Sequence, residues 1–219
     1  MNTQIALIHA TRAAVEPIEA AFADLWPEAA FWNLLDDGLS REIDRTGKLT
    51  GGLTGRLVDL AAYAANTGAD GIVFTCSAFG PAIEECQRRF AIPVLKPNDA
   101  LFEKALEIGG EIGLLATHPP ALPVLKDQLE RSAREAGQSI SVRPALAEGA
   151  WEALQSGHRD THDAAVAATA EKLAECGCIL LAQFSMAPLA KPIAAAVTPP
   201  VLTGPHTAVE KMKEMVSET

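Results

Sequence analysis

The chain has 219 residues, of which 18 are basic, 28 are acidic and 48% are hydrophobic, and its formal net charge is −10. This composition excludes a disordered chain and, without a run of lysine or arginine, argues against a nucleic-acid partner. No apolar stretch approaches the ~18–20 residues that span a bilayer, and the first residues lack a signal-peptide pattern, so we expect a cytoplasmic protein with no membrane partner and four free cysteines.

The first half of the chain predicts short strands that alternate with helices. The expected strands are 4–8, 30–35, 71–76 and 93–95, and the expected helices are 13–25, 53–66, 81–90 and 100–108. This alternation indicates parallel α/β units. The strands lack strict apolar/polar alternation, as expected when helices cover both faces of a sheet.

The second half repeats the first at an offset of 107 residues. Ile5-Ala6-Leu7-Ile8 matches Ile112-Gly113-Leu114-Leu115, and Pro81 and Pro93 have partners in Pro188 and Pro200. The repeat predicts strands over 112–117, 139–145, 178–183 and 200–202, and helices over 120–136, 160–175, 188–196 and 207–216.

The duplication predicts an α/β fold of two pseudo-symmetric lobes, each a short parallel sheet flanked by helices. The first lobe is expected to comprise residues 1–98 plus 207–219, and the second residues 99–206. Ligands of open parallel sheets bind beyond the carboxyl ends of the strands. We therefore expect the active site in a cleft between the lobes.

Polar residues gather at these predicted strand ends. Any one of them could be a satisfied structural residue, and their shared location is what favours a functional interpretation. The group includes His9, Thr11, Cys76, Asn98, Asp99, Thr117, His118, Gln183, Ser185 and His206.

Cys76 is the sharpest candidate for chemistry. It ends an apolar strand, small residues follow it, and a helix is expected near Pro81. Backbone amides and a helix N-terminus there would favour a thiolate with a pKa below the usual value. The alternative is a buried, inert cysteine.

The remaining cysteine and histidine patterns are weaker. Cys86 lies in the middle of a predicted helix, and Cys176 and Cys178 lie at a strand entry without further ligands nearby. His158 and His162 could clip a metal, but a solvated helix start is the better interpretation. Since no dinucleotide or phosphate-loop motif is present, we expect neither a cofactor nor a metal.

Two segments of the chain resemble the superfamily of aspartate, glutamate and hydantoin racemases, which also contains maleate isomerase and arylmalonate decarboxylase. They are GADGIVFTCSAFGPAIE in the first half and CGCILLAQFSMAPLA in the second. The resemblance implies one catalytic cysteine from each lobe, on either side of the reacting carbon, and a substrate carboxylate held beside the two turns.

Only the first of these cysteines has a match. Cys76 corresponds to it, and Ser77 and Ala78 correspond to the amide turn after it. The repeat places Gln183 where the second cysteine is expected, with Ser185 two residues further on. Glutamine has no useful acid/base pKa, and serine is a poor acid or base unless a neighbour activates it.

The leading hypothesis is a cofactor-independent isomerase of the aspartate/glutamate racemase type that acts on a small carboxylate such as an amino acid. Cys76 would serve one face, and His118 or His206 the other, because an imidazole pKa lies near neutrality. Thr117 and Ser185, with the amides near Ser77, would stabilise the enolate. Of the two histidines, His118 is the preferred acid/base, and the residues expected to line the substrate site include His9, Thr11, Gln183 and His206.

Two other classes stay open. One is a single-cysteine lyase, or a maleate-type cis-trans isomerase in which Cys76 is the proton donor or nucleophile. The other is a binding or regulatory protein that has lost catalysis. The sequence does not name the substrate, and because relatives often form dimers, a homodimer is a partner to test for.

Overall fold

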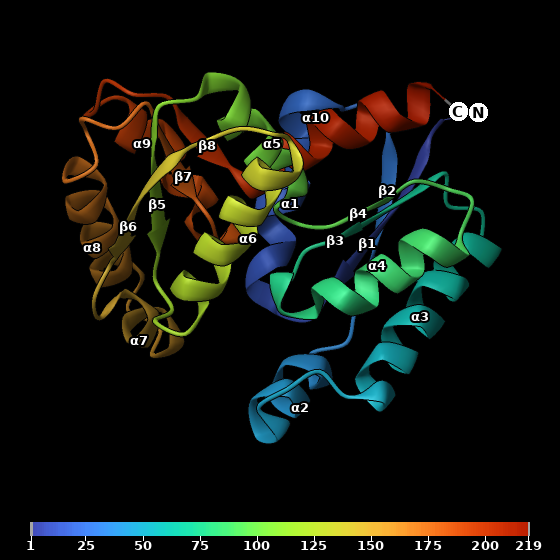
Figure 1. The fold of residues 1–219 in the computed structure, drawn as a ribbon. Coiled ribbons are helices and arrows are strands. Elements are labelled where there is room, and N and C mark those ends of the chain that lie inside the picture. The colour runs from blue at the N-terminus through green and yellow to red at the C-terminus, as the bar shows by residue number, and fades with distance from the viewer. Residues whose placement is uncertain (1, 219) are drawn as a thin grey trace. The chain divides into compact units, whose positions relative to one another are not determined.

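The computed structural model describes residues 2–218 and divides into two compact units. The first comprises Met1–Ala100 and Ala208–Thr219, and the second comprises Leu101–Thr207. Each unit contains a four-stranded sheet in which every neighbouring pair of strands is parallel (Figure 1). The predicted α/β class, with two parallel sheets flanked by helices, is therefore confirmed.

The sheet of the first unit has the strand order β2-β1-β3-β4. Its strands are β1 (Gln4–His9), β2 (Ala30–Leu35), β3 (Gly71–Phe74) and β4 (Val94–Leu95). The connecting elements are η1 (Arg12–Ala14), α1 (Val15–Leu25), α2 (Gly38–Thr46), α3 (Gly51–Asn66), η2 (Ser77–Phe79) and α4 (Gly80–Arg89).

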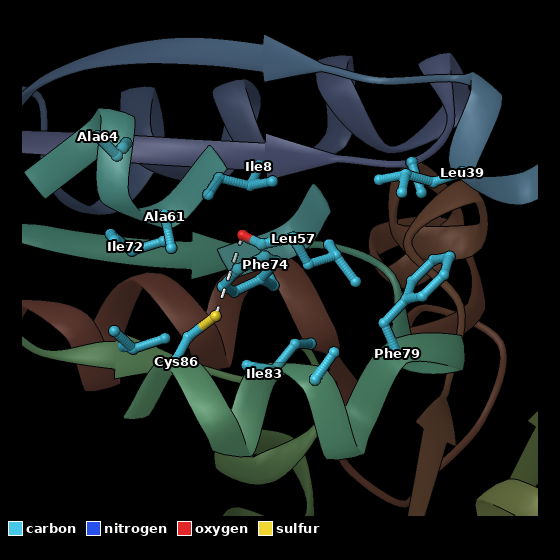
Figure 2. Close-up of a cluster of buried hydrophobic side chains, with 14 of the residues drawn as sticks. Ile8, Leu39, Leu57, Ala61, Ala64, Ile72, Phe74, Phe79, Ile83 and Cys86 are labelled. Carbon is cyan, nitrogen blue, oxygen red and sulfur yellow. Dashed lines mark hydrogen bonds between the residues drawn. The ribbon is translucent and has the colours of Figure 1, made fainter. Parts of the chain in front are cut away.

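One face of this sheet is covered by α3 and α4, which supply a hydrophobic cluster with β1 and β3 (Figure 2). Helix α3 contributes Leu53, Leu57, Ala61 and Ala64, spaced three or four residues apart on one side of the helix. From η2, Phe79 enters the same cluster and is only 1% exposed. The turn that follows β3 is thus anchored in the core.

The C-terminal helix α10 (Gly204–Ser217) also packs on this unit. Met212 of α10 is fully buried, and a Cβ atom added at Gly71 would lie 2.5 Å from its sulfur. A side chain at position 71 would therefore require the Met212 side chain to move from the place where it packs on β3. Near the end of α1, Lys213 donates to the Leu25 carbonyl at 3.3 Å and lies over the ring of Trp26.

The sheet of the second unit has the corresponding order β6-β5-β7-β8. Its strands are β5 (Glu111–Ala116), β6 (Ser141–Leu146), β7 (Cys178–Leu181) and β8 (Val201–Thr203). One face packs against α5 (Asp99–Ile108) and α6 (Ala121–Glu135). The other packs against α7 (Ala150–Gln155), α8 (Arg159–Glu171), η3 (Phe184–Leu189) and α9 (Ala190–Ala194).

Two helices were not predicted from the sequence. Helix α2 follows Asp37 and buries only Leu39, so its apolar face is too narrow to reveal the helical period. Helix α7 follows Gly149 and has six residues, too few for the period to emerge. The helix predicted over 188–196 is instead split between η3, which contains Pro188, and α9.

Candidate functional site

Cys76 lies in the turn between β3 and η2. Its backbone is extended, with φ −129° and ψ 119°, and it caps the short helix formed by Ser77–Phe79. Cys76 and Ser77 are half-buried and Ala78 is exposed. Because Phe79 holds the far side of this turn in the core, the thiol is carried on a fixed element rather than on a free loop.

The electrostatics of Cys76 differ from the sequence-based expectation. Burial raises the pKa of the thiol, the backbone N–H of Ala78 acts in the opposite direction, and the negative charge of Asp44 raises it further. The prediction of a lowered thiol pKa is therefore wrong for this structure. One amide does not offset desolvation, and Asp44 lies on α2, a helix that the sequence pattern did not reveal.

The other three cysteines lie in the cores. Cys86 is fully buried, with its sulfur 4.0 Å from the carbonyl oxygen of Leu57, and burial raises its pKa to about 11 (Figure 2). Burial also raises the pKa of Cys178 to about 11 and that of Cys176 in the same direction. Cys76 is the one cysteine of the chain that is not buried.

His9 does not present a ring nitrogen to a ligand. It is fully buried at the end of β1, with Nδ1 2.9 Å from the hydroxyl of Thr75 and Nε2 2.9 Å from Oδ1 of Asn33. Burial lowers the pKa of this imidazole. The expectation that His9 contacts substrate is therefore not supported, since both ring nitrogens bind neighbouring side chains.

In the second unit, Gln183 occupies the turn that corresponds to Cys76. It follows β7, caps η3, and has φ −129° and ψ 136°, close to the backbone conformation of Cys76. Its Oε1 accepts hydrogen bonds from the backbone N–H of Thr117 at 2.6 Å, from the Thr117 hydroxyl at 2.9 Å and from the N–H of His118 at 3.4 Å. Three donors fix the amide with its oxygen toward β5, which leaves the NH₂ group to face elsewhere.

His118 packs against an aromatic ring that the sequence pattern did not indicate. Its imidazole lies against the indole of Trp151, with ring centroids 4.5 Å apart and planes tilted by 41°. Trp151 belongs to α7, the second unpredicted helix. The contact restrains the plane of the imidazole and involves the ring face of His118 rather than a ring nitrogen.

The other predicted residues lie at the same sheet edges. Nδ1 of His206, in the first turn of α10, is 2.8 Å from the Thr203 hydroxyl, and Ser185 is a half-buried residue of η3. Thr11 is exposed and uses its hydroxyl to accept from the N–H of Ala13, which caps η1. A local capping role accounts for Thr11 without a ligand.

Asn98 is a strand-end polar residue of this edge for which the sequence predicts no specific role. It lies between β4 and α5, is 4% exposed, and its Nδ2 has no hydrogen-bond partner within residues 2–218. Pro97-Asn98 precedes α5 much as Pro205-His206 lies at the start of α10. That internal correspondence was the signal that could have singled Asn98 out.

His158 and His162 differ from each other. His158 is exposed, but His162 is fully buried, with Nδ1 2.7 Å from Asp163 Oδ1 and no partner for Nε2 among the described residues. A solvated start of α8 is therefore wrong for His162. Within residues 2–218, no three His, Cys, Asp or Glu side chains group as metal ligands would.

A family model for Asp/Glu/hydantoin racemases matches residues 5–212, nearly the whole chain. The chain belongs to this racemase family. The family match does not indicate which residues of this chain carry the chemistry.

Solved structures of racemases share the fold. An allantoin racemase from Klebsiella pneumoniae has a TM-score of 0.77 at 17% identity, over 99% of this chain and 89% of that one. A glutamate racemase from Bacillus anthracis has a TM-score of 0.74 at 11% identity, over 99% of this chain and 82% of that one. An arylmalonate decarboxylase variant has a TM-score of 0.64 at 14% identity, covering 98% and 93%. No curated protein matches the sequence significantly.

As a family member, this chain departs from the two-cysteine arrangement that its resemblance implied. In the first unit Cys76, Ser77 and Ala78 lie at the carboxyl edge of the sheet, and in the second Thr117, His118, Gln183, Ser185 and His206 do so. Each set is local to its own unit. None of the helices described is both long and apolar enough to cross a membrane.

Proposed function

We propose that this chain is a cofactor-independent isomerase of the racemase or epimerase type, acting on a small carboxylate such as an amino acid. The observation that carries the proposal is the pair of matching turns. One bears the titratable thiol of Cys76, and the other bears Gln183, whose amide oxygen is held by Thr117 and His118. Membership of the racemase family supports the reaction class.

In this proposal the proton leaves one face of the reacting carbon and returns to the other. The Cys76 thiolate takes the proton, the electron pair of the C–H bond moves into the carboxylate, and the imidazolium of His118 protonates the opposite face. In the reverse direction, neutral His118 takes the proton and the Cys76 thiol returns one. Each turnover leaves the two side chains in exchanged protonation states, which solvent resets.

Gln183 serves this reaction as a hydrogen-bond donor. Its oxygen is bound by Thr117, directly after β5, so its NH₂ group can donate to a substrate carboxylate or to the enediolate that develops from it. Ser77 and the N–H of Ala78 would act in the same way from the first unit. An amide cannot transfer the proton, which is why the proposal assigns that role to a histidine.

A single-thiol lyase is the second candidate, and the raised pKa of Cys76 favours it. Departing carbon dioxide would leave its electron pair on carbon, and the neutral thiol would protonate that carbon. Such a reaction needs one proton donor, so Gln183 in place of a second acid would be no handicap. Addition of Cys76 to an alkene diacid, followed by rotation and release, is a related use of the same thiol.

Proton exchange in heavy water separates these functions. The chain is incubated with D- and L-aspartate, D- and L-glutamate, allantoin and phenylmalonate, and proton NMR follows the C–H signal while carbon dioxide release is measured. An isomerase replaces C–H by C–D without losing carbon, and a lyase releases carbon dioxide. Cys86→Ala, which removes a core thiol, is the matched control for Cys76→Ala. Equal activity in both variants would refute the role of Cys76.

A further inference from the structure

Four side chains of the first unit form a continuous hydrogen-bonded chain that ends beside Cys76. Glu19 Oε1 accepts from Asn33 Nδ2 at 2.6 Å, and Asn33 Oδ1 lies 2.9 Å from His9 Nε2. His9 Nδ1 lies 2.9 Å from the hydroxyl of Thr75, the residue before Cys76. This series of hydrogen bonds runs from α1 through β2 and β1 to the end of β3.

The Glu19 carboxylate determines which group donates in each of these hydrogen bonds. A carboxylate only accepts, so Glu19 fixes the amide of Asn33 with its NH₂ group toward α1 and its oxygen toward His9. The Nε2 atom of His9 must then carry a proton to donate to that oxygen. A neutral imidazole has one N–H, so Nδ1 is an acceptor and the Thr75 hydroxyl is the donor.

We propose that His9 is a positioning residue, held as the neutral tautomer protonated at Nε2, which orients Thr75 and thereby the Cys76 turn. His9 does not touch the reacting atoms in this proposal and acts through Thr75. Thr75 is also tied to β1 by its backbone N–H, which donates to the Ile8 carbonyl at 3.1 Å. Two bonds to β1 then hold the residue immediately before the thiol.

The imidazole suits this role better than a shorter polar side chain. It spans the sheet from the exposed Asn33 on the edge strand to the buried Thr75, and it satisfies a buried hydroxyl that would otherwise be left with the Ile8 carbonyl 3.4 Å away. If His9 became an imidazolium, both ring nitrogens would be donors. The Thr75 hydroxyl would have to turn its proton toward the Ile8 carbonyl, and the His9–Thr75 hydrogen bond would then have His9 as its donor.

Nitrogen NMR of the full chain with ¹⁵N-labelled histidine tests the tautomer directly. The five histidines are resolved by the shifts of their ring nitrogens, and the His9 signals are those lost in His9→Gln. We expect a protonated Nε2 and an unprotonated Nδ1 at neutral pH. A proton on Nδ1, or on both nitrogens, would overturn the proposal. Asn33→Asp, which changes no side-chain size, should hold His9 as an imidazolium to higher pH.

The effect on Cys76 is tested with Thr75→Val, which removes the hydroxyl, and Thr75→Ser, which keeps it. We expect Thr75→Val to be alkylated at Cys76 by iodoacetamide about fivefold faster, the equilibrium effect of one net hydrogen bond, because the turn loosens. Thr75→Ser should stay within about twofold of the native rate. Buried Cys86 reports general unfolding and should stay unlabelled. Equal Cys76 rates in both variants would refute the positioning role.

The catalytic importance of these hydrogen bonds rests on the proposed function. The tautomer of His9 and the alkylation rates of Cys76 do not depend on it. If the tautomer and the alkylation rates are as stated and Cys76→Ala keeps full turnover, the proposed role of Cys76 fails while the positioning holds. If Cys76 is essential for turnover and His9 carries its proton on Nδ1, the positioning fails alone. In the joint case, Thr75→Val lowers kcat with little change in KM, and Thr75→Ser restores it.

Discussion

The turn after β3 and the turn after β7 have nearly the same backbone and different chemistry. Cys76 and Gln183 share φ −129°, cap short helices, and follow strands at corresponding positions in their sheets. One offers a thiol that titrates, and the other an amide that does not. The comparison teaches that the repeated fold supplies two turns of similar backbone conformation. The side chain at the first position of each turn then determines whether that turn can take part in proton transfer.

The strongest way to break this comparison is to remove the thiol. Cys76→Ala should lower the rate of proton exchange into substrate by about 10²–10⁴-fold, the usual contribution of a general acid or base. Isotope exchange measured in both directions checks this, because loss of one acid/base must slow both. Activity within twofold of the native chain would refute the acid/base role of Cys76 and with it the chemical difference between the two turns.

The anchors beneath the two turns should be costly to remove. Phe79→Ala is expected to lower the free energy of unfolding by about 3–5 kcal/mol and Met186→Ala by about 2–5 kcal/mol, since both side chains are buried in their units' cores. Urea denaturation measures both. Under native conditions, Phe79→Ala should also speed alkylation of Cys76, which Met186→Ala should leave unchanged. Equal labelling in both would mean that Phe79 does not hold the thiol's turn.

Gln183→Ala should have a smaller effect on the reaction. The loss of a donor to a charged group predicts a decrease in kcat/KM of about tenfold. Gln183→Glu should be worse, because a carboxylate cannot donate and repels an anionic substrate. Gln183→Cys sharpens the comparison, since a strong gain in racemisation would identify the native chain as a single-thiol lyase. Steady-state kinetics on the substrate found in the exchange assay decides among these results.

The smallest effect concerns the pH dependence of the thiols. Burial and Asp44 raise the pKa of Cys76 above the ordinary thiol pKa of 9.0. The rate of its alkylation by iodoacetamide should therefore still be increasing with pH at pH 9. Asp44→Asn removes the charge and should shift the curve to lower pH. Cys86 and Cys178, with pKa values of about 11 and full burial, should react more slowly throughout. Mass spectrometry of partly labelled protein would reveal preferential reaction at Cys86, which would contradict the assignment.

The fold could be predicted from the sequence largely because long apolar strands such as 112–116 leave a clear pattern. The site could be predicted only in part. Side chains at strand ends, such as Cys76 and Gln183, were found by their position in the repeat. Asp44 and Trp151 were missed because they lie on short or polar helices, where burial is too slight to mark the period. The role of His9 was mistaken because its partners Asn33 and Thr75 lie 24 and 66 residues away.

The contact between Gly71 and Met212 has a consequence for how the chain is made. The first unit cannot complete its core until residues 208–219 have been synthesised, since α10 supplies Met212 to the face where β3 begins. The second unit is continuous and is finished earlier. Domains that emerge from the ribosome usually fold from the N-terminus onward. In this protein the unit that carries Cys76 begins first in the chain, but the helix that completes its core is synthesised last.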